Sequence, residues 1–249
     1  MSLTDGIVGC WSPSVRGSGY LLPDLSGRGN HGTLTNMDAG TDWPGAAVRG
    51  VHGRVLDYDG TNDFVNCGQR GGDLTESIPF SVSAWAYARA FNLYSAIVSR
   101  DQSSPFAFAI RVGSGFPSIL TDGASVQAGS SVASLVWIHY CAVLSTSRRV
   151  FYIDGKAVID STASYTITAN NEPLSIGTDY LAASDRCWNG QIGETTIFNR
   201  ALTQAEVMDI YRSGNGAIGR QLTGQTRRRV YGFAPSTGAR RRRILTGMV

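Results

Sequence analysis

The chain has 249 residues, 42% hydrophobic and 16% charged, a composition that excludes a disordered chain and is typical of a large folded domain. It contains no run of 18 apolar residues, and residues 1–7 lack the basic start and apolar run of a signal peptide, so we expect neither a membrane span nor a leader. The formal charge of +3 is unevenly placed, because the last acidic residue is Asp209 and eight arginines follow from Arg220, which leaves residues 1–219 with 14 basic and 19 acidic groups and a net charge of −5.

Short β-type runs separated by turn residues make up most of the chain. The clearest runs are residues 80–87, 95–99, 106–112, 136–144 and 149–153, between clusters of Gly, Asn, Asp and Ser. Such a pattern is typical of an antiparallel sandwich. The pair Asp154-Gly155 stands between two of these runs and predicts a tight hairpin.

One helix is predicted after the last β-type run. Thr203 and Glu206 have the spacing of a capping box, three apolar residues follow at helical spacing, and Gly214 ends the pattern. We therefore expect residues 1–213 to form one domain that folds without the rest of the chain. Residues 214–249 are predicted to be a basic C-terminal arm, which has too little apolar surface to fold alone and becomes ordered on a partner.

Six segments carry recognisable patterns. They are residues 24–33 (DLSGRGNHGT), 56–65 (LDYDGTNDFV), 80–85 (FSVSAW), 137–140 (WIHY), 151–156 (FYIDGK) and 174–203, which includes WNGQIGE. In this order and spacing they resemble the laminin-G-like and pentraxin-like family of concanavalin A-like lectin domains. The resemblance implies an all-β fold, a two-sheet antiparallel jelly-roll sandwich, to which the sequence adds one short C-terminal helix and an Arg-rich tail. Lectins, adhesion modules and some glycosidases share this scaffold, so the fold does not choose the function.

The acidic pattern of a glycosidase is missing. Glycoside cleavage needs two carboxylates, and resemblance to the family's glucanases implies an E-x-D-x-x-E strand, whereas Glu194 is followed here by Thr-Thr-Ile-Phe. The G-x-S-x-G, H-E-x-x-H and P-loop motifs are also missing. His139 lies beside Trp137 in an alternating run and is expected to be a packed residue. We predict that the protein is not an enzyme and has no catalytic residues.

Calcium is the one cofactor that the sequence suggests. Resemblance to pentraxin-like members implies a rim site after the strand that ends before Asp101 and Gln102, and Asp179 falls in a second matched loop, where oxygen ligands would suit calcium. The dense acidic loop of pentraxins is not reproduced around Asp179. An alternative ligand set is Asp24, Asn30 and Asp59. Ordinary Asx turns are the competing interpretation of all these residues.

Exposed aromatic residues in loops are the candidates for sugar binding, because ligand sites combine aromatic side chains with a few polar groups. Tyr94, Phe116 and Tyr180 lie in or near predicted loops. The alternative for Tyr180 is a place in the core. We expect the tryptophans at positions 11, 85, 137 and 188 in the core. The four cysteines form no C-x-x-C pair and are expected to be buried reduced thiols.

A crude repeat of three arginines and two apolar residues marks the arm. Its copies are Arg227, Arg228, Arg229, Val230 and Tyr231, then Arg241, Arg242, Arg243, Ile244 and Leu245. Guanidinium groups that pair with carboxylates, next to apolar side chains that fill pockets, favour docking on a protein. Nucleic acid is the less favoured partner, and glycans are expected for the body. We expect a homo-oligomer or a symmetric assembly and no membrane contact.

These features together favour a non-catalytic structural or binding protein. The leading hypothesis is a bacteriophage virion surface component, either a head decoration or a fibre, with a lectin-like domain anchored by its C-terminal arm. One alternative is a stand-alone carbohydrate-binding or adhesion module, located outside the cell or at a bacterial surface. A second alternative is a nucleic-acid-associated protein that acts through the arm.

Overall fold

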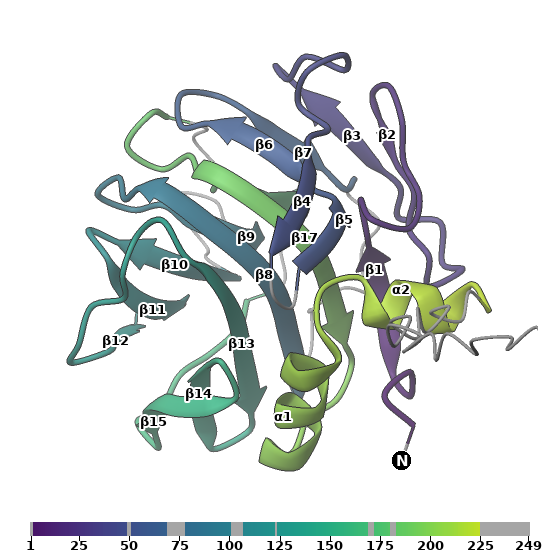
Figure 1. The fold of residues 1–249 in the computed structure, drawn as a ribbon. Helices are drawn as coiled ribbons and strands as arrows, with labels where there is room; N and C mark the ends of the chain where they lie inside the picture. The colour runs from purple at the N-terminus through teal and green to yellow at the C-terminus, as the bar shows by residue number, and fades with distance from the viewer. Residues whose placement is uncertain are drawn as a thin grey trace, which may run out of the picture.

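The computed structural model describes residues 2–48, 51–68, 78–100, 107–122, 124–168, 172–179 and 183–224. In these residues two antiparallel sheets pack face to face, and two short helices lie on one side of them (Figure 1). The predicted all-β, two-sheet sandwich is confirmed. The prediction of one helix is corrected to two, for a reason given below.

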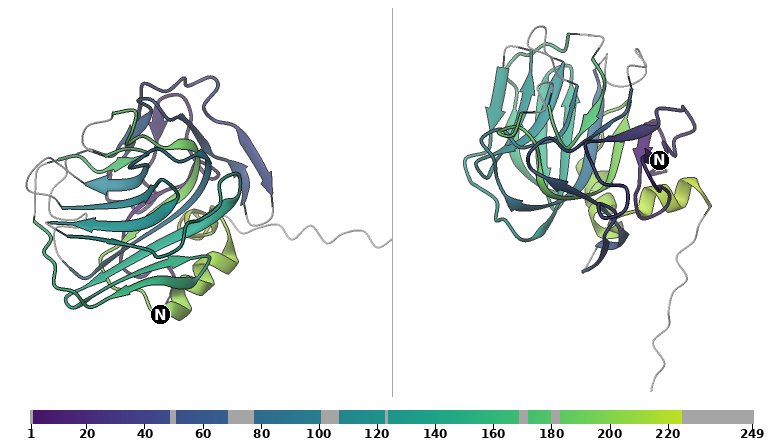
Figure 2. Two further views of the ribbon diagram at one scale, coloured as in Figure 1. Left: turned by 90° about the vertical axis from the view of Figure 1, so that its left-hand side faces the viewer. Right: turned by 90° about the horizontal axis from the view of Figure 1, so that it is seen from above.

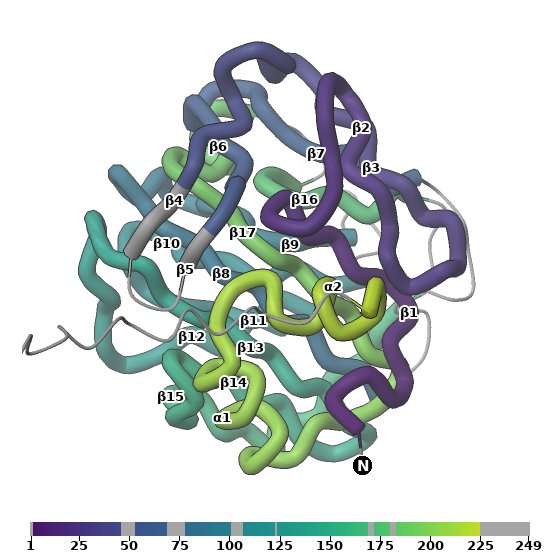
Figure 3. The backbone as a smooth tube through the Cα atoms, turned by 45° about the vertical axis from the view of Figure 1, so that its right-hand side comes forward, coloured from purple at the N-terminus to yellow at the C-terminus, as the bar shows by residue number. Residues whose placement is uncertain are grey.

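One sheet has eight strands. In spatial order they are β12 (Ala124–Gln127), β11 (Phe116–Thr121), β10 (Phe108–Gly113), β9 (Ala96–Arg100), β16 (Ser175–Ile176), β7 (Phe64–Asn66), β3 (Gly32–Thr35) and β2 (Leu21–Leu22). All neighbours are antiparallel. The late strand β16 lies between β9 and β7, so segments far apart in sequence form the middle of this sheet (Figure 3).

The other sheet has seven strands. Six follow in the order β1 (Ile7–Trp11), β17 (Asn189–Phe198), β8 (Phe80–Ala90), β13 (Trp137–Ser145), β14 (Arg148–Ile153) and β15 (Lys156–Ser161), and β6 (Leu56–Asp59) also pairs with β17. A separate hairpin is formed by β4 (Gly45–Val48) and β5 (Val51–Arg54). Figure 2 shows the layers from two further directions, with both helices on one side of the sandwich.

Two-residue turns set the register of two hairpins. Asp154 (φ 50°) and Gly155 (φ 77°) join β14 to β15, which confirms the predicted hairpin. Ser114 (φ 48°) and Gly115 (φ 88°) join β10 to β11 in the same way. Two successive positive φ angles match the right-handed twist of the flanking strands. The five predicted β-type runs correspond to β8, β9, β10, β13 and β14, with small shifts at their ends.

The main core lies between the two sheets. Its largest fully buried side chains are Trp11, Tyr58, Phe80, Phe108, Tyr140, Phe151 and Trp188. Each such side chain contributes about 1.5–3 kcal/mol by leaving water. The predicted core positions of Trp11 and Trp188 are confirmed. The four cysteines are free and buried, as predicted.

Trp85 and Trp137 do not join this core. Along β8 and β13 the neighbours Ala86 and Ile138 point into the main core, so strand alternation places the two tryptophans on the outer face of the seven-stranded sheet. Trp85 is buried there, whereas Trp137 is partly exposed. Trp85 thus belongs to a second, smaller buried cluster, and the core prediction is corrected for Trp137 alone.

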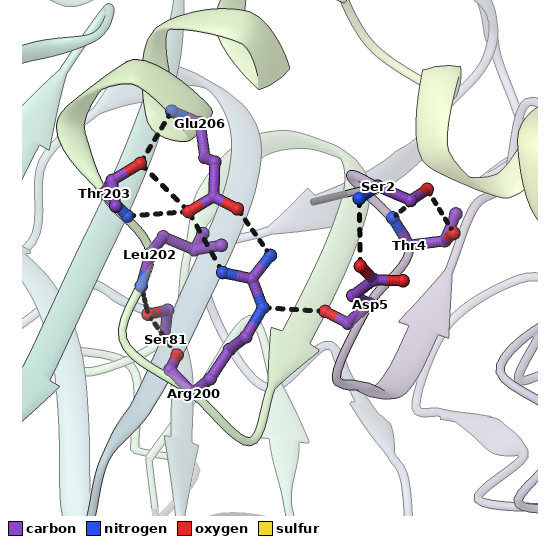
Figure 4. Close-up of polar contacts among 8 residues, drawn as sticks. All are labelled: Ser2, Thr4, Asp5, Ser81, Arg200, Leu202, Thr203 and Glu206. Carbon is purple, nitrogen blue, oxygen red and sulfur yellow. Dashed lines mark hydrogen bonds and ion pairs between the residues drawn. The ribbon is translucent and has the colours of Figure 1, made fainter.

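Helix α1 (Gln204–Ser213) begins at the predicted capping box. The Thr203 hydroxyl accepts from the Glu206 N–H at 3.3 Å, and Glu206 Oε2 accepts from the Thr203 N–H at 2.8 Å (Figure 4). Arg200 pairs with the same carboxylate at 2.8 Å. Gly214, at φ 77°, ends the helix as expected. No helix in the described part of the chain is long and apolar enough to cross a membrane.

Helix α2 (Ala217–Leu222) follows at once and packs on the body. Its Ile218 and Gly219 N–H groups donate to the Glu194 carboxylate at 3.1 and 2.7 Å. Asn215 is fully buried, and its Oδ1 accepts from the Glu194 N–H. The described body therefore continues to residue 224, beyond the expected boundary after residue 213.

The backbone of α2 lies very close to the body at Gly219, and this explains why the sequence pattern does not reveal the helix. A Cβ atom on Gly219 would lie 2.8 Å from Cβ of Ser12 and 2.9 Å from Oε2 of Glu194. The helix is thus docked by glycine contacts and one buried carboxylate, and it has no long apolar stripe to detect. The two arginine repeats of the arm lie outside the described residues.

Candidate functional site

A groove of about 440 Å³ lies on the outer face of the eight-stranded sheet. Strands β10, β11 and β12 form its floor, and the segment between β8 and β9 forms one wall. Its lining residues are Leu93, Tyr94, Arg111, Gly113, Ser114, Phe116, Ser118, Leu120, Ser125 and Gln127. Ile110, Val112 and Ile119 point into the core, so alternation along the strands turns Arg111 and Ser118 outward.

Strand register orders the floor into rows. Arg111 is the partner of Ser118, and Ser118 is the partner of Gln127, which gives a polar row across three strands. Phe116 is the partner of Gly113 at the end of the groove near the hairpin turn. The floor therefore places a guanidinium, a hydroxyl and an amide beside an aromatic ring. Together these groups donate and accept hydrogen bonds.

Tyr94 forms the wall and is 39% exposed. Its N–H donates to the Asp185 carbonyl at 2.8 Å, and the nearby Asn92 amide donates to the Cys187 carbonyl at 2.9 Å. A Cβ atom on residue 113 would lie 2.5 Å from the Leu93 carbonyl oxygen. Only glycine therefore allows the wall to approach the floor this closely. The groove is thus held in shape by backbone contacts.

A charged cluster supports the Tyr94 ring. The buried Asp179 carboxylate accepts from Arg111 Nη2 at 2.6 Å and from Arg186 Nη1 at 2.7 Å. The two guanidinium groups lie 5.8 and 5.0 Å from the centre of the Tyr94 ring, within the range of cation–π attraction. This cluster joins β10, the wall and the segment after β16 at one point.

The structure places Asp179 in ion pairs with Arg111 and Arg186, and calcium binding by Asp179 stays a prediction. Its carboxylate already accepts from two guanidinium groups, and a cation at that position would meet both positive charges. Asp101 and Gln102 lie outside the described residues, so calcium there stays a prediction. Within the described ranges no group of three or more His, Cys, Asp or Glu side chains could hold a metal ion.

The alternative calcium ligands are held in turns. The Asp24 carboxylate accepts from the N–H groups of Cys10 and Asn30 at 3.0 and 3.1 Å. Asp59 belongs to another turn, where it accepts from the Thr61 N–H at 2.6 Å. Asp24 also accepts from the Ser26 N–H at 2.9 Å, so both carboxylates accept from the residue two positions on, as in an Asx turn.

Two titratable groups named in the sequence analysis are buried away from the groove. Burial raises the pKa of Glu194, while the donors from α2 oppose that rise. Burial lowers the pKa of His139 to about 3, so its imidazole is neutral. The His139 Nε2 atom lies 2.9 Å from the Ser83 hydroxyl. The expectation that His139 is a packed residue is confirmed.

Two of the three predicted sugar-binding aromatics meet in the groove. Tyr94 and Phe116 both line it, whereas Tyr180 lies outside the described residues. Sequence reasoning missed Arg111, although its position between two core residues of one strand could have indicated an outward side chain. Its pairing with Asp179, 68 positions away in sequence, has no signal in one sequence.

Comparison with known proteins identifies the scaffold. A sequence model of the concanavalin A-like lectin/glucanases superfamily matches residues 59–208. Among curated proteins, none matches the sequence.

Solved structures are similar in fold at low identity. The binding domain of Paraclostridial Mosquitocidal Protein 1 has a TM-score of 0.65 and 14% identity, over 85% of this chain and 53% of that one. Domain 4 of AbnA, a GH43 extracellular arabinanase from Geobacillus stearothermophilus solved with arabinotriose, has a TM-score of 0.62 and 16% identity, over 82% and 98%. Trypanosoma rangeli sialidase has a TM-score of 0.61 and 13% identity, over 84% and 33%. The match thus spans about half of the mosquitocidal domain and a third of the sialidase.

Proposed function

Because the chain belongs to the concanavalin A-like lectin/glucanase superfamily, we propose that it is a non-catalytic carbohydrate-binding protein whose glycan lies in the groove between Tyr94 and Phe116. The observation that carries the proposal is the juxtaposition of these two rings with the polar row of Arg111, Ser118 and Gln127. One structural neighbour, domain 4 of the arabinanase AbnA, was solved in complex with arabinotriose, which supports a saccharide as the class of ligand.

The groove suits a polyhydroxylated ligand. The C–H face of a sugar ring packs on an aromatic face, while its hydroxyl groups exchange hydrogen bonds with the polar row. Tyr94 is pre-positioned by its backbone contacts and by the guanidinium groups of Arg111 and Arg186. Little ordering of the wall is then needed on binding, which favours affinity.

The lining also favours binding over cleavage. Glycoside hydrolysis needs two carboxyl groups on either side of the scissile bond, roughly 5–10 Å apart. Among the lining residues that the structure describes, none is Asp or Glu. The nearby Asp179 is buried and engaged by two guanidinium groups, so it is not placed to receive a proton from water or to protonate a leaving group.

Native gels cast with soluble polysaccharides test this proposal. We expect arabinan, β-glucan, xylan or alginate to retard the wild-type chain, and Tyr94→Ala to weaken the retardation about tenfold. Tyr94→Phe is the matched control, because it keeps the ring and should keep most of the binding. A parallel assay for new reducing ends should stay at background. Release of reducing ends, or equal retardation of Tyr94→Ala and the wild type, would contradict the proposal.

A second proposal concerns location. We infer that the carbohydrate-binding body is a component of a virion surface, a head decoration or fibre, anchored by its C-terminal arm. The described body up to residue 224 has 15 basic and 19 acidic groups and a net charge of −4, and the seven arginines that follow it support an assembly contact. The fixed position of α2 on the body supports it too, since the arm then starts from a defined point.

Arm variants separate the possible partners. For a protein partner, serine at Arg241, Arg242 and Arg243 and serine at Ile244 and Leu245 should weaken incorporation into particles comparably. For nucleic acid, the arginine variant alone should fail, and wild-type binding should fall steeply between about 50 and 300 mM salt. Particles that assemble normally with both variants would remove the support for an anchoring arm.

A further inference from the structure

The outer face of the seven-stranded sheet carries a row of side chains that the groove does not use. Strand register places Asp57 of β6 opposite Gln191 of β17, Gln191 opposite Tyr87 of β8, and Tyr87 opposite Trp137 of β13. All four residues are partly exposed. We call these four residues the aromatic row. The helices cover another part of this face, where α1 and α2 pack on an apolar cluster.

One end of the aromatic row is a pair of rings. The centres of Tyr87 and Trp137 lie 5.8 Å apart, with planes inclined at 43°. The neighbouring Leu135 and Val136 are 63% and 45% exposed. Cross-strand aromatic pairs stabilise sheets, yet a pair that serves stability alone needs no polar partners in register beside it.

The other end of the row is polar and fixed. Gln191 Nε2 donates to Asp57 Oδ2 at 3.1 Å, and the Arg89 guanidinium pairs with the same carboxylate. Arg89 Nη1 also donates to the Tyr58 carbonyl at 3.1 Å. The Asp57 and Arg89 side chains keep 21% and 42% of their surface exposed. A carboxylate, an amide and a guanidinium are thus held beside the two rings, and the charges of Asp57 and Arg89 compensate each other.

We propose that the aromatic row is a second carbohydrate-binding surface, which takes a neutral saccharide chain. Sugar rings would stack on Tyr87 and Trp137, and their hydroxyl groups would bond to Gln191, Asp57 and Arg89. Compensated charge favours a neutral saccharide over an acidic one, since an anion would meet the Asp57 carboxylate. The ligand class rests on the proposed function, while the surface itself shares no residue with the groove.

Two sites on opposite faces of the sandwich make the chain bivalent. The groove lies on the outer face of the eight-stranded sheet and the aromatic row on the outer face of the seven-stranded sheet. One short oligosaccharide cannot reach both faces, whereas a long polysaccharide can engage both or bridge two chains. Avidity then makes retention on a polymer stronger than binding of its trisaccharide.

The test uses the full chain in native gels that contain arabinan, β-glucan, xylan or alginate. Trp137→Ala should weaken retardation by a neutral polysaccharide about tenfold, and Trp137→Phe, which keeps a stacking ring, should restore most of it. Leu135→Ala removes an exposed apolar neighbour and should change nothing. A thermal melt of each variant shows that the fold is kept, and Gln191→Ala gives a second variant that disturbs packing little.

The outcomes separate this inference from the proposed function. If Trp137→Ala and Gln191→Ala migrate like the wild type in every gel while Tyr94→Ala does not, the second binding surface is refuted and binding in the groove is supported. If the Trp137 and Gln191 variants alone lose retardation, binding at the aromatic row is supported and binding in the groove is refuted. Absence of retardation of the wild type in all four polysaccharides contradicts both. Self-association that Leu135→Ala and Trp137→Ala both abolish would assign the face to a protein contact and overturn the inference.

Discussion

The two outer faces of the sandwich follow the same alternation rule and end in opposite states. On the seven-stranded sheet, outward residues such as Val143, Val150 and Phe198 are apolar, and α1 and α2 cover them to make a second core. On β10–β12 of the eight-stranded sheet, outward residues such as Arg111 and Ser118 are polar, and the face stays an open groove. The backbone supplies two equivalent platforms, and side-chain polarity distinguishes the part that the helices cover from the part that stays an open groove.

The largest loss of stability should come from removing α2, which covers part of the seven-stranded sheet. Truncation after Ser213 removes Ile218 from the second core and leaves the buried Glu194 carboxylate without its α2 donors. We expect a loss of at least about 4 kcal/mol, which lowers the melting temperature by about 10 °C. Truncation after Gly224 keeps all of these contacts and should melt like the full chain. Equal melting of the two truncated forms would show that α2 adds nothing to the body.

The next largest effect should come from the charged cluster behind the groove. Asp179→Asn keeps the shape of the side chain but removes the charge that pairs with Arg111 and Arg186. We expect a loss of about 2–3 kcal/mol in chemical unfolding, because both guanidinium groups are left largely buried. Asp160→Asn is the control, since its ion pair with Arg148 is exposed and contributes little. Chemical unfolding of Asp179→Asn at the same free energy as the wild type would mean that this cluster does not stabilise the open face.

A smaller, pH-dependent effect should come from the start of α1. Arg200 holds the pKa of Glu206 down to about 2, below its ordinary value of 4.5. The folded state therefore favours the ionised form, so the stabilisation is fully present above about pH 4.5 and is lost as the pH falls toward 2.

Glu206→Gln tests this effect. The variant should unfold about 1 kcal/mol more easily than the wild type at pH 7, and the difference should shrink as the pH falls toward 2. Asp209→Asn, an exposed site on the same helix, should show no such trend. A gap between Glu206→Gln and the wild type that is constant from pH 7 to 3 would refute the assignment.

The smallest effect on stability should come from the wall of the groove. Tyr94 is exposed, and its loop is held by backbone contacts. Tyr94→Ala should therefore cost less than about 1 kcal/mol in unfolding, although it removes most of the proposed binding. A large loss of stability in this variant would make the ring a structural element, and the contrast between the two faces would then be weaker.

Local patterns predicted much of this architecture. The alternating runs, the Asp154-Gly155 turn and the Thr203–Glu206 capping box are short-range signals, and the structure contains all of them. Sequence reasoning missed α2, because its docking depends on glycine contacts with Ser12 and Glu194 that a periodicity search does not detect. The core prediction fails for Trp137, because periodicity gives alternation but does not say which of the two faces is the main core.

The candidate site was less predictable than the fold. Residue type and predicted loops indicate Tyr94 and Phe116, but their meeting in one groove depends on the pairing of β10 with both β9 and β11. The supporting cluster joins Arg111, Asp179 and Arg186 across long sequence separations, and one sequence gives no sign of such a contact.

The central claim is that the open face binds a glycan without cleaving it. The most direct measurement is a crystal structure of the wild-type chain soaked with a short oligosaccharide of the polysaccharide that retards it most strongly. We predict an intact oligosaccharide in the groove, with a sugar ring against Tyr94 or Phe116 and hydroxyl groups at Arg111, Ser118 or Gln127. A cleaved product, or an oligosaccharide bound elsewhere with this groove empty, would contradict the account.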